Sequence, residues 1–196
     1  MFYIDWTYII LVLPAIAFSL WASTRVNTTF TKYSKQRIRS GMTGSEMARS
    51  ILNENGLRDV RIECVAGNLT DHFDPKTNVV RLSESVYSGS TSAALGVAAH
   101  ECGHALQHAR AYAPLKMRSA LVPVVQFSSS IVSWVLLAGI LMVQSMPQIL
   151  LAGIVLFAAS TLFSFMTLPV EINASQRALA WMSSAGITNV FNHKAA

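Results

Sequence analysis

The sequence predicts an α-helical membrane protein with three transmembrane helices and a small α+β domain on the cytoplasmic side. Only 13% of the residues are charged and 52% are hydrophobic, whereas a soluble domain usually carries about 25% charged residues. Two long segments, 6–24 and 122–168, contain no charged side chain at all. The formal net charge of +5 fits basic segments beside a membrane as well as a nucleic-acid binder.

The first uncharged segment, 6–24, predicts an N-terminal membrane anchor in a first region 1–24. Its length is sufficient to cross a hydrocarbon core of about 30 Å. Trp6, Tyr8 and Trp21 lie near its ends, where aromatic belts form. A cleaved signal peptide is the rival interpretation, but residues 1–5 contain no Lys or Arg, which a signal peptide needs. A buried core helix is the other alternative, and the length of the segment disfavours it.

Basic residues follow this segment at once and none precedes it; they are Arg25, Lys32, Lys35, Arg37 and Arg39. Cytoplasmic flanks of membrane helices carry an excess of such residues. We therefore expect the N-terminus outside and the chain from residue 25 onward in the cytoplasm. Contact with anionic lipid headgroups explains the stretch 32–39 more simply than RNA binding, so we expect no nucleic-acid partner.

The polar region, 25–118, predicts the α+β domain. Thr43 and Glu46 have the spacing of a capping box that opens a helix, and Gly56 ends that helix. The segments 59–65 and 79–83 resemble strands on either side of a turn-rich connection. We expect them to pair as a β-hairpin. Serine and threonine residues at 88–92 then cap a helix that runs from Ala93 to about Arg110.

The second uncharged segment, 122–168, is too long for a single crossing. The sequence QSMPQ at 144–148 divides it into two halves of about 20 residues, each sufficient to span a bilayer. A pair of buried helices in a soluble protein is the alternative. Two crossings, within a region 119–168, return the chain to the cytoplasmic side, where the last region, 169–196, begins.

The predicted helix 93–110 carries the motif His100-Glu101-Cys102-Gly103-His104, which matches the H-E-x-x-H pattern. Side chains four residues apart lie on one face of a helix, so two imidazoles at this spacing can bind one tetrahedral Zn²⁺ ion. Glu101 lies at the edge of that face and can hold a water molecule that zinc polarises. A solvated helix face with two histidines is the alternative, and the small apolar neighbours of the motif argue against it.

A catalytic zinc commonly has three protein ligands and one open position. His108 lies about 12 Å along the helix axis from His100 and cannot share one ion with both histidines. Glu171 is the better candidate, because two crossings bring it to the side of His100 and His104. Ser175, four residues after Glu171, can support a histidine ring, and Asn173 lies between them. A solvated acid beside the membrane is the alternative for Glu171.

Three further sites have weaker signals. The sequence DHFDP offers Asp71, His72 and Asp74, which are typical of a turn; His72 is also a candidate donor to the oxyanion of a transition state. Cys102 is more typical of a small packing residue than of a reactive thiol. Tyr112 can face the site, although nothing in the spacing requires it.

Three stretches resemble the bacterial membrane-bound neutral zinc metallopeptidases of the YugP type: LTDHFDP, GVAAHECGHALQHARAYAPLKMRSALVP and LPVEINASQRAL. The resemblance extends from about Tyr33 to about Leu179. It implies an integral membrane peptidase in which His100, His104 and Glu171 bind zinc and Glu101 is the general base. Asn173 departs from the family, in which an acidic residue is expected two places after the glutamate ligand. The family also usually continues into another hydrophobic segment beyond the point where this chain stops.

We therefore expect a zinc endopeptidase of the bacterial cytoplasmic membrane, in which zinc-activated water hydrolyses peptide or membrane-protein substrates. A role in membrane-protein processing or quality control would fit. The lipid bilayer is the expected surrounding, and a partner membrane protein or a second copy of the chain is an open alternative. The competing function class is a non-catalytic scaffold in which zinc only staples the domain to the last helix; a closed site with four protein ligands would indicate it.

Overall fold

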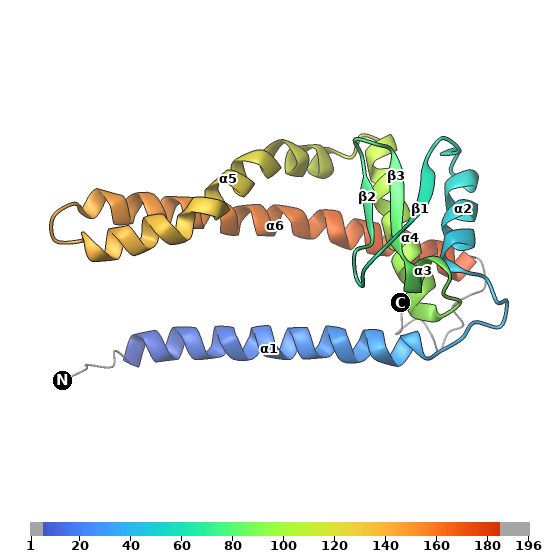
Figure 1. Cartoon of the computed structure of the whole chain (residues 1–196), viewed down its shortest axis with the longest axis horizontal. Coiled ribbons are helices and arrows are strands. Elements are labelled where there is room, and N and C mark those ends of the chain that lie inside the picture. Colours follow the sequence, from blue (N-terminus) through green and yellow to red (C-terminus); the bar gives the residue numbers. More distant parts are fainter. Residues whose placement is uncertain (1–5, 185–196) are drawn as a thin grey trace.

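A long helix, α1 (Trp6–Ser34), leads into a small α+β domain in the computed structural model, which describes residues 6–184. The domain contains α2 (Gly44–Glu54), a sheet of three strands, the short helix α3 (Glu84–Tyr87) and α4 (Ser92–Ala109). Two long helices follow, α5 (Ala113–Leu141) and α6 (Pro147–Ser184). Figure 1 shows α1 and the α5–α6 pair extending from the same side of the domain.

The sheet corrects the predicted β-hairpin. Its strands are β1 (Arg61–Val65), β2 (His72–Asp74) and β3 (Val79–Ser83), in the order β1-β3-β2. The segments that we expected to pair as a hairpin, β1 and β3, are parallel. The hairpin is formed by β2 and β3, which are antiparallel. The prediction was wrong because the DHFDP stretch, interpreted as a turn, itself supplies an edge strand and leaves β3 in the centre.

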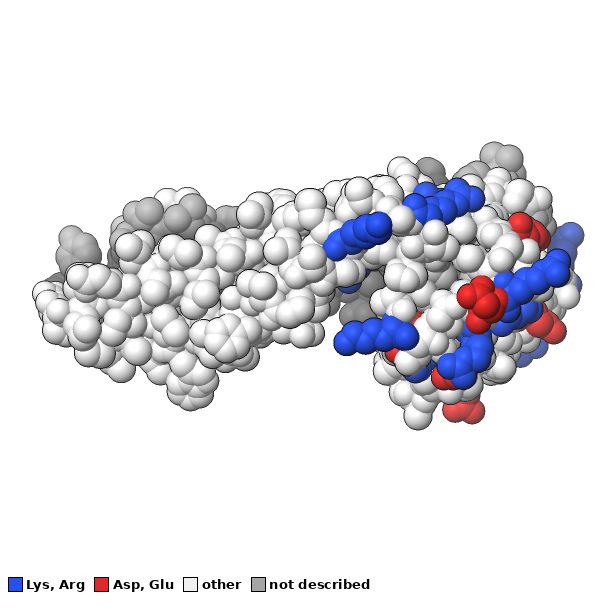
Figure 2. All heavy atoms as spheres, turned by 90° about the horizontal axis from the view of Figure 1, so that it is seen from above, with Lys and Arg blue, Asp and Glu red and all other residues white. Residues whose placement is uncertain are grey.

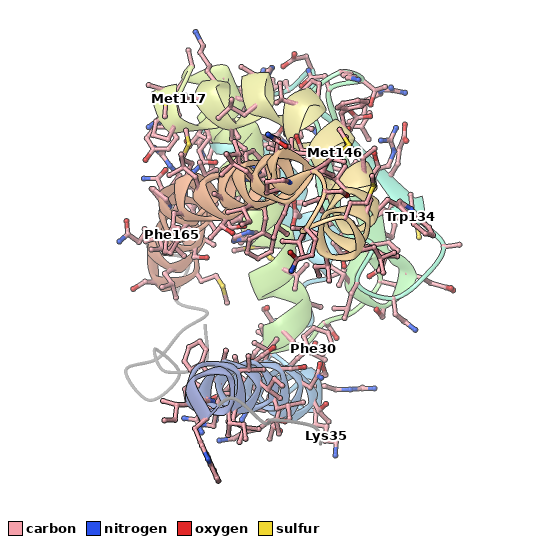
Figure 3. The ribbon with its side chains drawn as sticks, turned by 90° about the vertical axis from the view of Figure 1, so that its left-hand side faces the viewer. Phe30, Lys35, Met117, Trp134, Met146 and Phe165 are labelled. Atoms are coloured by element: carbon pink, nitrogen blue, oxygen red, sulfur yellow. The ribbon has the colours of Figure 1, made fainter. Side chains whose placement is uncertain are left out.

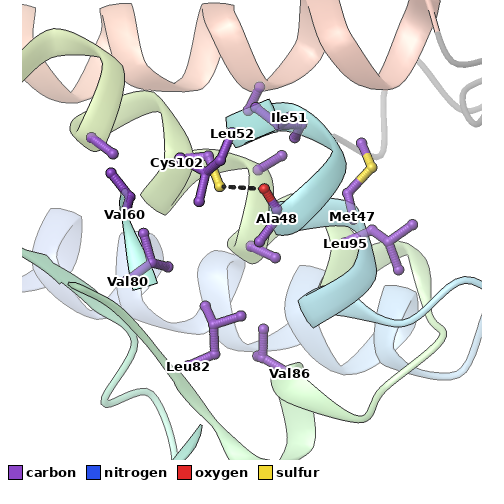
Figure 4. Close-up of a cluster of buried hydrophobic side chains, with 14 of the residues drawn as sticks. Met47, Ala48, Ile51, Leu52, Val60, Val80, Leu82, Val86, Leu95 and Cys102 are labelled. Atoms are coloured by element: carbon purple, nitrogen blue, oxygen red, sulfur yellow. Dashed lines mark hydrogen bonds between the residues drawn. The ribbon is translucent and has the colours of Figure 1, made fainter. Parts of the chain in front are cut away.

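The core of the domain lies between α2, α4 and the sheet. α2 begins as predicted, because the Thr43 hydroxyl accepts from the Glu46 N–H and the Glu46 carboxylate accepts from the Thr43 N–H. Figure 4 shows the buried side chains that meet there. They come from all three elements and include Met47, Ile51, Leu52, Val80, Leu82, Leu95 and Cys102. The core therefore packs against α4 and holds in place the helix that carries the H-E-x-x-H motif.

α5 and α6 are long and apolar enough to cross a membrane. The chain turns between them at 142–146, which overlaps the breaker predicted at 144–148. Many apolar side chains along both helices are exposed, among them Trp134 and Phe165 (Figure 3). Figure 2 shows that Lys, Arg, Asp and Glu side chains gather over the domain and its junction with the helices, while the far part of the helical extension carries none on the face in view. Two of the three predicted membrane segments thus have a counterpart, and the role of α1 as an anchor stays a prediction.

Helix α6 continues from its apolar half into the domain without a break, although Pro169 lies inside it. The predicted boundary at 168–169 therefore falls inside one helix. The start of the predicted region 1–24 and the end of the region 169–196 lie outside the described residues. Because Glu171 belongs to the same helix as the apolar segment, its position is set by how α6 enters the domain.

Candidate metal centre

The close approach of α4 and α6 is what brings the motif and Glu171 together. Gly103 lies at their contact, where an added Cβ would lie 2.8 Å from the carbonyl oxygen of Ala174. A side chain at position 103 would force the two helices apart. The glycine inside the H-E-x-x-H motif therefore has a packing role that the spacing of the histidines alone does not reveal.

Three ligand-type atoms converge across this contact. The Nε2 atoms of His100 and His104 are 3.1 Å apart, and the Glu171 Oε2 atom lies 3.2 Å from the first and 3.4 Å from the second. Ligand atoms 2.0–2.1 Å from a tetrahedral zinc ion lie about 3.3–3.4 Å from one another. Two imidazoles and a carboxylate are also a donor set that zinc accepts. The residues present therefore fit a zinc ion.

The other ring nitrogens are held by the protein, which orients each Nε2 toward Glu171. His100 Nδ1 lies 3.2 Å from the Ser175 hydroxyl, and His104 Nδ1 lies 3.0 Å from the Gln107 side-chain oxygen. The Gln107 amide is fully buried and donates to the Val170 carbonyl oxygen and to Asn173 Oδ1. Hydrogen bonds of this kind fix the tautomer and the ring orientation of histidines that bind metals. Ser175 contacts a motif histidine directly, whereas Asn173 acts through Gln107.

Arg118 of α5 holds the remaining oxygen of Glu171. Its guanidinium Nη1 donates to Glu171 Oε1 over 2.8 Å, so Oε2 is left facing the two histidines. The guanidinium and the imidazoles together stabilise the charged form of the carboxylate. Helix α5 therefore contributes to the geometry of the centre even though it carries none of the three converging atoms.

The Glu101 carboxylate lies beside the three converging atoms and is nearly buried, at 9% exposure. Its Oε2 accepts a hydrogen bond from the Phe73 backbone N–H of the edge strand β2 over 3.0 Å. Burial raises the pKa of Glu101, and the two imidazoles and the Phe73 N–H partly oppose this shift. For His104, burial lowers the pKa, but the hydrogen bond with Glu171 and the Glu101 charge outweigh it, so the pKa of His104 is raised. A carboxyl group of raised pKa is suited to accept and return a proton.

A cavity of about 410 Å³ opens over these groups. Its walls include His72, Phe73, His108, Arg118 and Val122, besides the residues described above. His72 is exposed, and its Nδ1 lies 2.7 Å from the Thr70 carbonyl oxygen. That contact needs a proton on Nδ1, so Nε2 can donate to a ligand only when the ring is protonated. His108 contacts the Phe73 ring, with ring centroids 5.8 Å apart, and is not one of the three converging residues.

The other candidates have structural contacts. Asp71 accepts from the N–H and the hydroxyl of Ser83, which ties the loop before β2 to the end of β3. Asp74 accepts from the Lys76 N–H and the Thr77 hydroxyl, as the turn interpretation predicts. Cys102 is buried in the core, and its thiol donates to the Ala48 carbonyl oxygen (Figure 4). Burial raises the pKa of that thiol, which is the opposite of what a reactive cysteine needs. Tyr112 is the N-cap of α5.

Two residues of the centre were missed by the sequence reasoning. Gln107, three residues after His104, has no signal of its own in a single sequence. Arg118 had a signal in the sequence, because it is the last charged residue before the long uncharged segment and Glu171 is the first after it. Two crossings bring such a pair to the same side, where opposite charges attract.

Comparison with known proteins identifies the family of the chain. Residues 8–196 match the family model described as "Putative neutral zinc metallopeptidase". The chain is also similar to a protein of Bacillus subtilis (strain 168) named "Putative membrane protease YugP", with 47% identity over 179 residues, which are 91% of this chain and 79% of that protein. No solved structure matches the chain. The extent of the family match and the identity to this relative show that the chain belongs to the neutral zinc metallopeptidase family.

Proposed function

We propose that this chain is an integral membrane zinc endopeptidase whose catalytic face lies toward the cytoplasm. The observation that carries the proposal is the geometry of the centre. Three ligand-type atoms lie 3.1–3.4 Å apart, and a second carboxylate, that of Glu101, lies beside them at the wall of an open cavity. The family and the membrane relative support the same class of reaction.

His100, His104 and Glu171 are the residues that would hold the metal. A zinc ion there supplies Lewis-acid chemistry, since it lowers the pKa of a water molecule and polarises a carbonyl group. Ser175 and Gln107 keep the two imidazoles in the orientation that binding needs, and Arg118 keeps Glu171 from rotating away. These contacts fix the directions in which the three ligand atoms point.

Glu101 is the proton carrier in this proposal. Its carboxylate accepts the proton of the attacking water and then returns it to the amide nitrogen of the leaving peptide. Glu101 is held by the Phe73 N–H and not by the converging atoms, so it stays free of the metal. Burial raises the pKa of Glu101, which makes its carboxylate a stronger base toward the attacking water.

The substrate is proposed to lie along β2. This strand is at the edge of the sheet, and its Phe73 N–H reaches Glu101, so an extended peptide added to this edge would pass over the reacting groups. His72 lines the same cavity. As a donor to the oxyanion it would act in its protonated form, because its Nδ1 proton is used by Thr70.

The scaffold alternative, in which zinc is a staple between the domain and α6, has less support. Gly103 and Ala174 are already in close contact, and Gln107 already bonds to the Val170 carbonyl oxygen of α6. The two helices therefore have a joint of their own. A cavity beside the ligand atoms is also what a site with an open coordination position needs.

Removal and return of the metal tests the proposal. Purified protein in detergent should lose casein cleavage after treatment with 1,10-phenanthroline and recover it on addition of one equivalent of Zn²⁺. Circular dichroism should show that the stripped protein keeps its helices. Unchanged cleavage without metal would refute the zinc mechanism. Loss of α-helical structure on stripping, with no cleavage at any stage, would instead favour the staple.

A further inference from the structure

Three cavities form a series along one face of α4. The cavity over the metal centre and a second one of about 290 Å³ share Asp71, His100 and Glu101 as wall residues. The second cavity and a third one of about 350 Å³ share Gly96, Val97 and His100. Each neighbouring pair therefore adjoins, and we call this series of three cavities, from the centre to α1, the groove.

The far end of this groove is apolar and lies between three helices. Phe30 and Tyr33 come from α1, Val97 from α4, and Leu179 and Met182 from α6. The chain after α1 is tied to the start of α4, since Ile38 N–H donates to the Ser90 carbonyl oxygen and Ser92 N–H to that of Gln36. Figure 1 shows α1 running past the domain at this end. An apolar, concave lining with few polar groups is typical of a ligand site.

Gly96, at the floor of the groove, has no structural reason to be glycine. The other eight glycines that the structure describes either have a positive φ or would clash with a neighbour if they carried a Cβ. Gly96 has an ordinary φ, and an added Cβ would meet nothing within 4 Å. A glycine inside a helix costs roughly 1 kcal/mol relative to alanine. What Gly96 provides is open space where the second and third cavities join.

We propose that this apolar cavity is the specificity subsite of the enzyme and takes a bulky apolar side chain of the substrate polypeptide. The inference rests on the proposed peptidase function. His100, one of the three converging residues, lines both this cavity and the cavity over the centre, so a peptide whose scissile bond lies at the centre would have a neighbouring side chain within reach of the apolar cavity. Arg25, the first basic residue after the apolar part of α1, is also in the cavity wall, so the subsite lies beside the end of the predicted N-terminal anchor.

The test places a larger side chain at Gly96, on the floor of the groove. Two synthetic peptides are made from one casein cleavage site and differ at a single residue next to the cleaved bond, which is Phe in one peptide and Ala in the other. The position chosen is the one at which the wild-type protein shows the strongest preference for apolar residues. Wild type should prefer the Phe peptide in kcat/KM. Gly96→Leu should reduce the ratio of Phe to Ala cleavage by about 10-fold or more, since one methylene group in an apolar pocket changes selectivity about 10–200-fold. Thr29→Phe, which narrows the cavity from the exposed face of α1, should shift the ratio in the same direction.

A binding measurement separates the subsite from the chemistry. In zinc-loaded Glu101→Gln protein, added Gly96→Leu should weaken binding of the fluorescently labelled Phe peptide more than that of the Ala peptide. Ala109→Leu is the matched control, because it adds the same side chain at an exposed position of the same helix outside the three cavities.

Two results would overturn the inference. If both filling variants keep the wild-type ratio in cleavage and in binding, the cavity is not a subsite; a lipid acyl chain as occupant would give this outcome. If zinc-loaded wild type cleaves and binds neither peptide, the peptidase proposal fails together with the subsite.

Discussion

At the scale of single residues, the metal centre depends on groups that fix the direction of other groups. His100 and His104 present their Nε2 atoms to Glu171 because Ser175 and Gln107 occupy the opposite ring nitrogens. Arg118 does the same for the carboxylate. The motif histidines and Glu171 could be predicted from spacing and topology. Gln107 could not be assigned a role in the same way, because its contacts with α6 depend on the fold. The crossing topology that places Glu171 also places Arg118 beside it, a signal that the sequence reasoning missed.

The first prediction concerns the third ligand. Glu171→Ala should reduce the zinc content of the purified protein and abolish proteolysis, because two imidazoles alone do not complete the three-ligand set of a catalytic zinc. His108→Ala is the comparison, since His108 lies in the same cavity but is not among the converging residues. It should leave the zinc content near that of wild type. Zinc analysis by mass spectrometry decides, and loss of zinc in His108→Ala with retention in Glu171→Ala would reverse the assignment.

A second prediction concerns Gln107. Gln107→Leu removes the acceptor for His104 and the buried donor to the Val170 carbonyl oxygen. Zinc affinity should fall about 10–100-fold, the usual effect of losing a group that supports a metal ligand. Competition with a fluorescent zinc chelator measures it. An unchanged affinity would mean that the orientation of His104 does not depend on this contact.

At the scale of elements, α4 and the β2–β3 hairpin explain where the site is. The start of α2 at its capping box and the extent of α4 followed from local signals, because caps and helical periodicity involve near neighbours in the chain. The pairing of the strands did not follow from local signals. The segments 59–65 and 79–83 looked like partners across one turn, yet β1 and β3 are parallel because the residues 72–74 between them form a strand. Short strands rich in Asp and His resemble turns, and only their pairing with β3 reveals them.

The hairpin gives a third prediction, on stability against pH. Arg81, then Thr77 and the Lys76 N–H, hold the pKa of Asp74 well below its ordinary value of 3.8. A carboxyl group with a depressed pKa in the folded state adds stability above its unfolded pKa and loses it as the pH falls further. The melting temperature of wild type should therefore drop more steeply below about pH 4 than that of Asp74→Asn. Thermal unfolding followed by circular dichroism measures this, and equal slopes would show that the ion pair with Arg81 does not couple to folding.

At the scale of the whole molecule, charged and apolar surface are separated from one another. The apolar lengths of α1, α5 and α6 extend to the same side of the domain (Figure 1), and the charged side chains gather over the domain (Figure 2). The two long uncharged segments of the sequence are enough to predict this separation. The length of the helices was less predictable, since α6 carries its apolar stretch and Glu171 on one continuous helix.

A fourth prediction follows from the proposed orientation, in which the domain lies on the cytoplasmic side of the membrane. In intact cells, a membrane-impermeant maleimide should label a cysteine placed at Gln144, in the turn between α5 and α6. A cysteine at Asn68, in the loop between β1 and β2, should be labelled only after the membrane is opened. The exposed native Cys64 is replaced by serine in both variants. Labelling of position 68 from outside would invert the orientation.

The fifth prediction is the most direct test of the central claim. Each purified protein is measured for the amount of zinc per chain and for the rate of casein cleavage. Glu101→Gln should hold as much zinc as wild type, because Glu101 is not among the three converging ligand residues, and should cleave about 10²–10⁴-fold more slowly, the usual contribution of a general base. Glu54→Gln, an exposed position on α2, is the matched control and should match wild type in both measurements. Equal cleavage by Glu101→Gln and wild type would contradict the account.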